Sequence, residues 1–131
     1  MALLARLAIG NRSLVAYNLH LESRNGDDLR CSQIAELLDD ARQYGSDVVV
    51  IAAGDFNVDI TEVTVPALNQ PAFENPFAGL NVATIPSGAF GRERAIDWIL
   101  IRGNVKAESP QVHNSIMASD HFPLSLTLHL P

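Results

Sequence analysis

Four short polar segments of the chain carry the residue types that acid–base and metal chemistry require. They are residues 18–23 (NLHLES), residues 54–57 (GDFN), Asp97 inside the apolar run 96–100 (IDWIL), and residues 119–124 (SDHFPL). Carboxylate oxygens are hard ligands that suit Mg²⁺ or Mn²⁺. A histidine with an ordinary pKa of about 6.5 can give or take a proton near neutral pH. Converging segments of this kind would form a site for metal-assisted chemistry.

The carboxylates of this set need partners if the segments meet. Two unit charges about 4 Å apart repel by roughly 4 kcal/mol at an effective dielectric constant of 20. Asp55, Asp97 and Asp120 would therefore require cations, imidazolium groups or hydrogen-bond donors nearby. Asp97 is the most informative of the three, because a lone carboxylate between Ile96 and Trp98 is costly to bury without a partner.

Each segment also has an ordinary structural interpretation when it is taken alone. Gly54-Asp55 after a strand is typical of a turn, with Asn57 as a turn residue. His20 at a strand end is commonly a satisfied polar residue, and Asp120-His121 can be a loop pair joined by local hydrogen bonds. The functional interpretation therefore depends on the ordered set and not on any single member.

Hydrophobic patterning predicts the elements that position these segments. Residues 3–9 and 13–19 are apolar runs that flank Gly10-Asn11, a pair typical of a tight hairpin turn. Apolar residues at spacings of three and four predict an amphipathic helix over residues 28–44, which Asp27 or Asp28 can cap. The remaining expected elements are strands at residues 47–53, 96–101, 105–108 and 124–130, and a short helix near residues 63–69. We expect three of the polar segments, at residues 18–23, 54–57 and 119–124, to lie at or just beyond the carboxyl end of a strand, and Asp97 to lie inside one.

The composition favours one folded domain over residues 1–131. The chain is 47% hydrophobic and 18% charged, which excludes a disordered protein, and no apolar stretch approaches the roughly 20 residues of a membrane span. A single cysteine, Cys31, fits a reducing compartment, so we expect a cytoplasmic location. The net charge of −6 argues against a broad cationic surface for nucleic acid, but a local metal site can still attract phosphate.

In this order, the GDFN and SDH motifs with an IDxIL strand between them resemble the endonuclease/exonuclease/phosphatase superfamily, which includes deoxyribonuclease I, exonuclease III, neutral sphingomyelinases and inositol-polyphosphate phosphatases. The HLES segment, with Arg30 and Gln33 downstream, is most similar to the tyrosyl-DNA phosphodiesterase branch. The resemblance covers nearly the whole chain but only the C-terminal half of the family's domain. It implies an α/β (α+β) fold: half of a four-layer α/β/β/α sandwich, with a mostly antiparallel mixed sheet and one main helix on its outer face.

The resemblance also implies roles for the motif residues. Asp55 would orient or deprotonate the attacking water, and Asn57 would donate an amide hydrogen to a phosphate oxygen. Asp97 would hold the imidazole of His121 in one tautomer. His121 itself would contact the scissile phosphate or shuttle a proton, and His20 would be a second imidazole facing the phosphate.

A metal and a phosphate-ester substrate follow from the same resemblance. Asp120 and Asp55 would be the carboxylates associated with Mg²⁺ or Mn²⁺. Asn18 and Arg94 would contact the substrate, although Arg94 stands one position before the family's usual arginine, where this sequence has Ala95. The expected reaction is metal-dependent hydrolysis of a phosphodiester or phosphomonoester in a nucleic acid, a phospholipid or an inositol phosphate.

The sequence departs from the family in one important respect. The family's N-terminal half supplies a glutamate that is its principal metal ligand, and no Asp or Glu precedes Glu22 here. This leaves open a non-catalytic remnant or a phosphate-binding module. A lone half would also expose the inner face of its sheet. We expect a second copy to cover that face in a homodimer burying more than about 1,200 Å², or else a separate N-terminal half to cover it.

Overall fold

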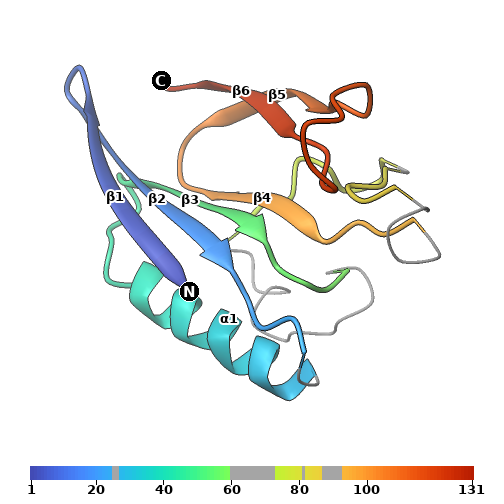
Figure 1. Cartoon of the computed structure of the whole chain (residues 1–131). Helices are drawn as coiled ribbons and strands as arrows, with labels where there is room; N and C mark the ends of the chain where they lie inside the picture. Colours follow the sequence, from blue (N-terminus) through green and yellow to red (C-terminus); the bar gives the residue numbers. More distant parts are fainter. Residues whose placement is uncertain (25–26, 60–72, 81, 87–92) are drawn as a thin grey trace.

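The computed structural model describes residues 1–24, 27–59, 73–80, 82–86 and 93–131. In this part of the chain, a four-stranded sheet lies between one helix and a two-stranded sheet (Figure 1). The mixed α+β architecture, mostly sheet with one main helix, agrees with the fold class that the sequence predicts. The short helix expected near residues 63–69 falls outside the described residues.

The four-stranded sheet is mixed and mostly antiparallel. β1 (Ala2–Ile9) and β2 (Arg12–His20) form the expected hairpin around Gly10, which has a φ of +61°. β2 pairs in parallel with β3 (Val49–Asp55), and β3 pairs antiparallel with β4 (Asp97–Arg102), giving the order β1-β2-β3-β4.

The helix α1 (Asp27–Ala41) makes the crossover that a parallel pair of strands requires. Ile34, Leu37 and Leu38 are buried on its inner side and pack against residues of β2 and β3. The helix ends at Ala41 and not at residue 44 as the pattern predicts. It covers one face of the sheet, as Figure 1 shows.

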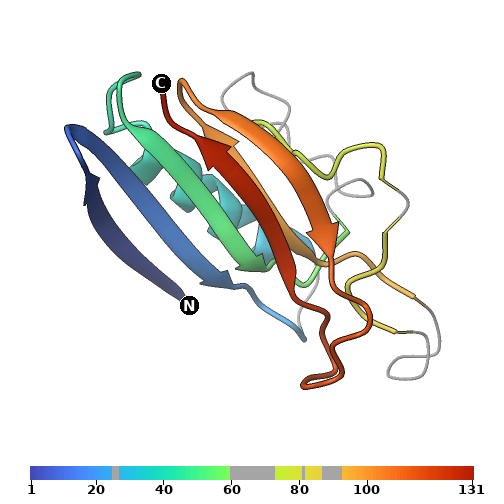
Figure 2. The same cartoon turned by 90° about the horizontal axis from the view of Figure 1, so that it is seen from above.

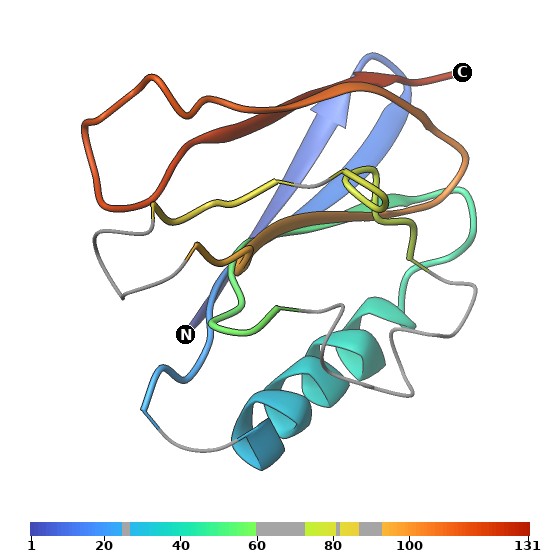
Figure 3. The same ribbon diagram turned by 90° about the vertical axis from the view of Figure 1, so that its right-hand side faces the viewer.

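The opposite face is partly covered by β5 (Lys106–Val112) and β6 (Leu124–His129), which pair antiparallel. Figures 2 and 3 show this hairpin lying across the larger sheet. The contact buries Leu14, Val49 and Ile101 against a group that includes the following partly buried residues: Val105, Ala107, Leu126, Leu128 and Leu130. The expectation of an uncovered inner face is therefore wrong for this part of the sheet, because the edge piece expected at residues 105–108 is the start of a full strand.

The strand β1 remains outside this cover. All of its residues are exposed, including Leu3 at 67%, Leu7 at 47% and Ile9 at 50%. Leu7 lies opposite the buried Leu14, so these three side chains share the face that β5 and β6 cover further along the sheet. The described part of the chain contains no helix that is long and apolar enough to cross a bilayer.

Candidate active site

Three polar residues form a row across the end of the four-stranded sheet. His20 lies opposite Asp55 in the parallel register of β2 and β3, and Asp55 lies opposite Asp97 in the antiparallel register of β3 and β4. Directly opposed residues of neighbouring strands project from the same face of a sheet. The register therefore places one imidazole and two carboxylates side by side, on the face toward β5 and β6.

Gly54 allows β2 and β3 to approach closely just before this row. Its φ is +133°, and a Cβ atom there would lie 2.1 Å from the carbonyl oxygen of Leu19. The next residue, Asp55, accepts a hydrogen bond on its backbone oxygen from the Leu21 N–H at 2.9 Å. The glycine of the GDFN motif thus allows the close approach of the strands that positions Asp55.

We expect Gly54→Ala to lower the free energy of unfolding by about 3 kcal/mol or more, because the backbone of β2 must shift and the alanine must adopt a strained φ. Gly10→Ala is the matched control: its φ is also positive, but no atom lies within 4 Å of the added Cβ. Its cost should be about 1–2 kcal/mol. Urea unfolding followed by circular dichroism measures both values, and equal losses would contradict the close-approach argument.

Only some of the side-chain hydrogen-bond donors and acceptors of the GDFN turn are used by the turn itself. Asp55 Oδ1 accepts the N–H of Asn57 at 2.7 Å, while Asn57, with a φ of +53°, donates from Nδ2 to the carbonyl oxygen of Leu21 at 3.0 Å. Phe56 is fully buried between them. The turn interpretation is therefore correct, and it leaves Asp55 Oδ2 and the second Nδ2 hydrogen of Asn57 for other partners.

A histidine–carboxylate pair stands beside this turn. His121 Nδ1 lies 2.9 Å from Asp97 Oδ2 and 3.1 Å from Oδ1. The Asp97 side chain is 15% exposed and the His121 side chain 28% exposed. Because a carboxylate accepts the hydrogen on Nδ1, the neutral imidazole keeps its lone pair on Nε2. The arrangement is the one that the family resemblance implies for these two residues.

Burial and neighbouring charges shift the pKa values of this pair. Burial raises the pKa of Asp97 above its ordinary value, and the negative charge of Asp55 adds to this effect against opposing hydrogen bonds. Burial alone would lower the pKa of His121, but the hydrogen bond and charge of Asp97 outweigh it. The charges of Asp55 and Asp120 act in the same direction, so the pKa of His121 is raised overall. His121 is therefore protonated to a greater extent at neutral pH than an ordinary histidine.

The same residues fit a divalent cation. Asp55, Asp97 and His121 each offer a ligand atom, and these atoms lie within 4.8 Å of one another. Two carboxylates with an imidazole form a donor set that Mg²⁺ or Mn²⁺ accepts. Because Nδ1 of His121 is engaged by Asp97, the carboxylate oxygens are the more available ligands.

The other expected site residues lie around this cluster at different distances from it. His20 is on the rim, with its side chain 69% exposed and Nε2 3.7 Å from Asp55 Oδ2. Asn18 is exposed on the same face of β2, two positions earlier. Arg94 precedes β4 and pairs through its backbone with Ile85. Asp120 is exposed, accepts a hydrogen bond from the Ser119 hydroxyl at 3.2 Å, and lies outside the group of close donor atoms.

Sequence reasoning missed Thr84, which is 1% exposed and hydrogen-bonded to the backbone of Asp97. No motif marks it, since it lies in a loop-rich stretch with no periodic pattern. Thr84 and Asp97 are far apart along the chain, so no local sequence rule predicts their contact.

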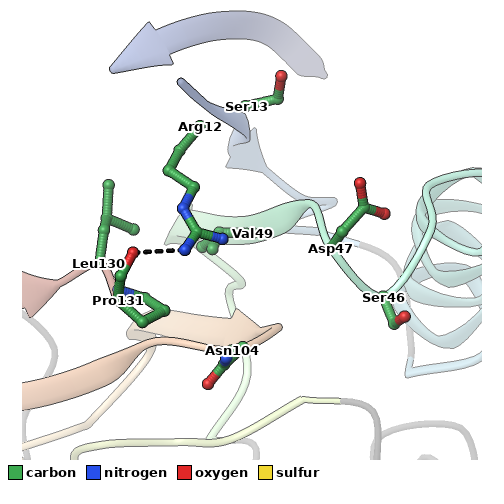
Figure 4. Close-up of a pocket in the computed structure, with 8 residues that line it drawn as sticks. All are labelled: Arg12, Ser13, Ser46, Asp47, Val49, Asn104, Leu130 and Pro131. Atoms are coloured by element: carbon green, nitrogen blue, oxygen red, sulfur yellow. Dashed lines mark hydrogen bonds between the residues drawn. The ribbon is translucent and has the colours of Figure 1, made fainter. Parts of the chain in front are cut away.

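A separate pocket of about 410 Å³ lies at the opposite end of the sheet, where β2 and β3 begin. Figure 4 shows Arg12 reaching across it, where the guanidinium donates to the carbonyl oxygen of Pro131 at 2.6 Å. Asp47 and Asn104 also line this pocket. It is remote from the Asp55 row and does not share its chemistry.

Comparison with known proteins agrees with this geometry. Residues 4–121 match the Endonuclease/Exonuclease/phosphatase family, a range that contains Asp55, Asp97 and His121. The chain belongs to this family. No curated protein sequence matches the chain.

Solved structures of the family share the fold. A humanized D. rerio TDP2 is 21% identical with a TM-score of 0.82, over 98% of this chain and 60% of that chain. A truncated Caenorhabditis elegans TDP2 is 23% identical with a TM-score of 0.75, over 98% and 59%. A mannosyl-6-phosphatase from Bacteroides thetaiotaomicron is 22% identical with a TM-score of 0.64, over 92% and 53%. The likeness to these structures shows the fold, and this family member spans about 60% of the first TDP2 chain.

Proposed function

We propose that this family member hydrolyses phosphoesters with the help of a divalent metal, at the cluster formed by Asp55, Asp97 and His121. The observation that carries the proposal is the hydrogen-bonded pair of His121 and Asp97 beside the Asp55 carboxylate. Hydrolysis requires water to attack phosphorus. A carboxylate that orients this water and a polarised imidazole are the groups that the attack requires.

Each side chain has a role that follows from its position. Asp55 Oδ2 orients the attacking water, since Oδ1 is occupied by the Asn57 N–H. His121, held through Nδ1, presents Nε2 to a phosphate oxygen or to the leaving oxygen. A divalent cation held by the Asp55 and Asp97 carboxylates would offset negative charge on the phosphate. Asn57 donates its second amide hydrogen to the phosphate.

The substrate is a diester or monoester of phosphate, and the neighbours illustrate both classes. One D. rerio TDP2 structure holds a single-strand DNA product, and another neighbour is named a mannosyl-6-phosphatase. The low basicity of this chain, with 9 Lys and Arg, disfavours long duplex nucleic acid. Short single-stranded nucleic acids, phospholipids and inositol phosphates remain within the proposal.

The test is hydrolysis of bis-p-nitrophenyl phosphate and p-nitrophenyl phosphate by the wild-type chain. We expect turnover with Mg²⁺ or Mn²⁺, its loss in EDTA, and its return when excess metal is added. Calorimetric titration of the EDTA-treated chain should show micromolar binding of Mn²⁺ or Mg²⁺. Turnover that is unaffected by EDTA, or no turnover of either ester, would overturn the proposal.

A phosphate-binding module without turnover is the second candidate. It is favoured by the exposed position of Asp120 outside the group of close donor atoms. Such a protein would bind inorganic phosphate in calorimetry while leaving both p-nitrophenyl esters intact. Metal-dependent turnover excludes this candidate.

We also propose that a second copy of the chain covers the exposed apolar side of β1. Leu3, Leu7 and Ile9 lie there in a row on an edge strand, which is a common route to association. Multi-angle light scattering at micromolar concentration should give twice the mass of the chain, and Leu7→Asp should give the single mass. Leu29→Asp, at an exposed leucine of α1, is the matched control and should remain dimeric. A wild-type monomer would contradict the proposal.

A further inference from the structure

Thr84 lies where three parts of the candidate site meet. It precedes Ile85, whose bridge to Arg94 brings this segment next to the start of β4. Its side chain is buried, and its N–H donates to the Arg94 carbonyl oxygen at 2.8 Å. A buried hydroxyl must find hydrogen-bond partners within the protein, because an unpaired one costs free energy.

The hydroxyl of Thr84 finds its partners at Asp97. Oγ1 accepts the backbone N–H of Ile96 at 3.0 Å and that of Asp97 at 3.2 Å. The hydroxyl itself donates to the carbonyl oxygen of Arg94 at 3.5 Å. Thr84 also lowers the pKa of the Asp97 carboxyl, against the effect of burial. One oxygen atom therefore holds the backbone N–H groups of Ile96 and Asp97 together at the start of β4.

The backbone of Thr84 reaches the other member of the pair. Its carbonyl oxygen accepts the N–H of Phe122, the residue after His121, at 2.7 Å. Thr84 thus holds the Asp97 strand through its side chain and the His121 loop through its main chain. Among the described residues, Thr84 alone hydrogen-bonds to the backbone at both Asp97 and Phe122.

The same part of β4 also receives the GDFN turn. The N–H of Phe56 donates to the carbonyl oxygen of Ile96 at 2.9 Å, and the Ile96 N–H is one of the donors to Thr84. A displacement at Ile96 would therefore move Asp55 relative to Asp97. Errors of about 1 Å in such a constellation can lower rates by about 10²-fold.

We infer that Thr84 is a positioning residue of the active site, which sets the separation of Asp97 and His121 through its hydroxyl and its carbonyl oxygen. It does not touch the substrate or the reacting atoms. For its kinetic consequences the inference rests on the proposed hydrolase function, but the placement of His121 can be observed without turnover.

The test compares three substitutions in the full chain. Thr84→Val keeps the shape and removes the hydroxyl, Thr84→Ser keeps the hydroxyl, and Thr127→Val makes the same chemical change at an exposed position of β6. With bis-p-nitrophenyl phosphate and Mg²⁺, Thr84→Val should lower kcat by about 10- to 100-fold with little change in KM. Thr84→Ser and Thr127→Val should stay within about threefold of wild type. A purely structural role would not give this split or this rescue.

The second readout is the ring resonance of His121 in NMR spectra of the metal-free chain. Thr84→Val should shift it, while Thr84→Ser and Thr127→Val should leave it in place. If the wild type has no turnover, the proposed function fails and this resonance alone decides the inference. An unshifted resonance in Thr84→Val, or an equal loss of kcat in Thr84→Ser, would overturn it. Should Thr84→Val not fold, Thr84→Ala replaces it in the same comparison with Thr84→Ser.

Discussion

Asp55→Ala should lower kcat for bis-p-nitrophenyl phosphate by about 10³-fold or more. This loss of rate lies within the range that a positioned acid–base group usually contributes, or exceeds it. Asp55 is the central residue of the row, opposite both His20 and Asp97, and its Oδ2, 3.7 Å from His20 Nε2, is the oxygen that the Asn57 N–H does not occupy. The substitution removes that oxygen together with one of the carboxylates that fit a metal. Initial rates at saturating Mg²⁺ measure the loss.

The structural role of Asp55 must be separated from its chemistry in this experiment. Asp55→Asn keeps an oxygen that can accept the N–H of Asn57 but loses the charge, so it should fold like the wild type and remain nearly inactive. Asp39→Ala, at an exposed carboxylate of α1 paired with Arg42, is the control and should keep full activity. Wild-type rates in Asp55→Asn would remove Asp55 from the mechanism.

Local sequence rules predict the elements that carry the site but not their exact register. The hairpin follows from Gly10-Asn11, and the helix follows from the spacing of Ile34, Leu37 and Leu38. The strand predicted at residues 47–53 is observed as β3 at Val49–Asp55. This shift matters, because Asp55 is a paired strand residue and not only a turn residue, which is why it aligns with His20 and Asp97.

The family motifs bring together more of the site than local patterns can. They place Asp55, Asp97 and His121 at one point, as the structure does. They do not separate Asp120, whose exposed carboxylate turns toward Ser119, from the clustered donors. Such differences depend on side-chain direction in a loop, which neither periodicity nor a short motif specifies.

Local sequence patterns do not predict the long-range packing of the chain. The alternation of Leu124, Leu126 and Leu128 predicts a strand with one buried face, but not which surface buries it. In the structure, that surface is the inner face of the larger sheet, so the hairpin of β5 and β6 forms a third layer. The loop between these strands then carries His121 over the row of polar residues.

Asp97→Asn should lower kcat by about 10²-fold or more, because His121 loses the partner that fixes its tautomer and favours its imidazolium form. The hydrogen bond and charge of Asp97 are the main causes that raise the pKa of His121. Removing the charge should therefore lower that pKa toward or below its ordinary value. An NMR titration of the His121 ring in EDTA measures the change directly.

The raised pKa also has a defined effect on stability. His121 binds its proton more tightly in the folded chain, so its contribution to the free energy of unfolding is fully present below the unfolded pKa of about 6.5. That contribution is lost as the pH rises through the raised, folded pKa. Urea unfolding of the wild type from about pH 5.5 to 8.5 should show this decline, and Asp97→Asn should show little of it.

A second histidine–carboxylate pair provides the control for Asp97. His129 Nε2 lies 3.0 Å from Glu108 Oε2 on the exposed surface of β5 and β6, away from the row at the end of the sheet. Glu108→Gln removes a carboxylate from a histidine in the same way, yet should leave kcat and the pKa of His121 unchanged. If both substitutions lower kcat alike, the loss arises from a general change in charge and not from the pairing of His121 with Asp97. If neither does, the His121–Asp97 pair has no part in the reaction, and the proposed mechanism would have to rest on Asp55 alone.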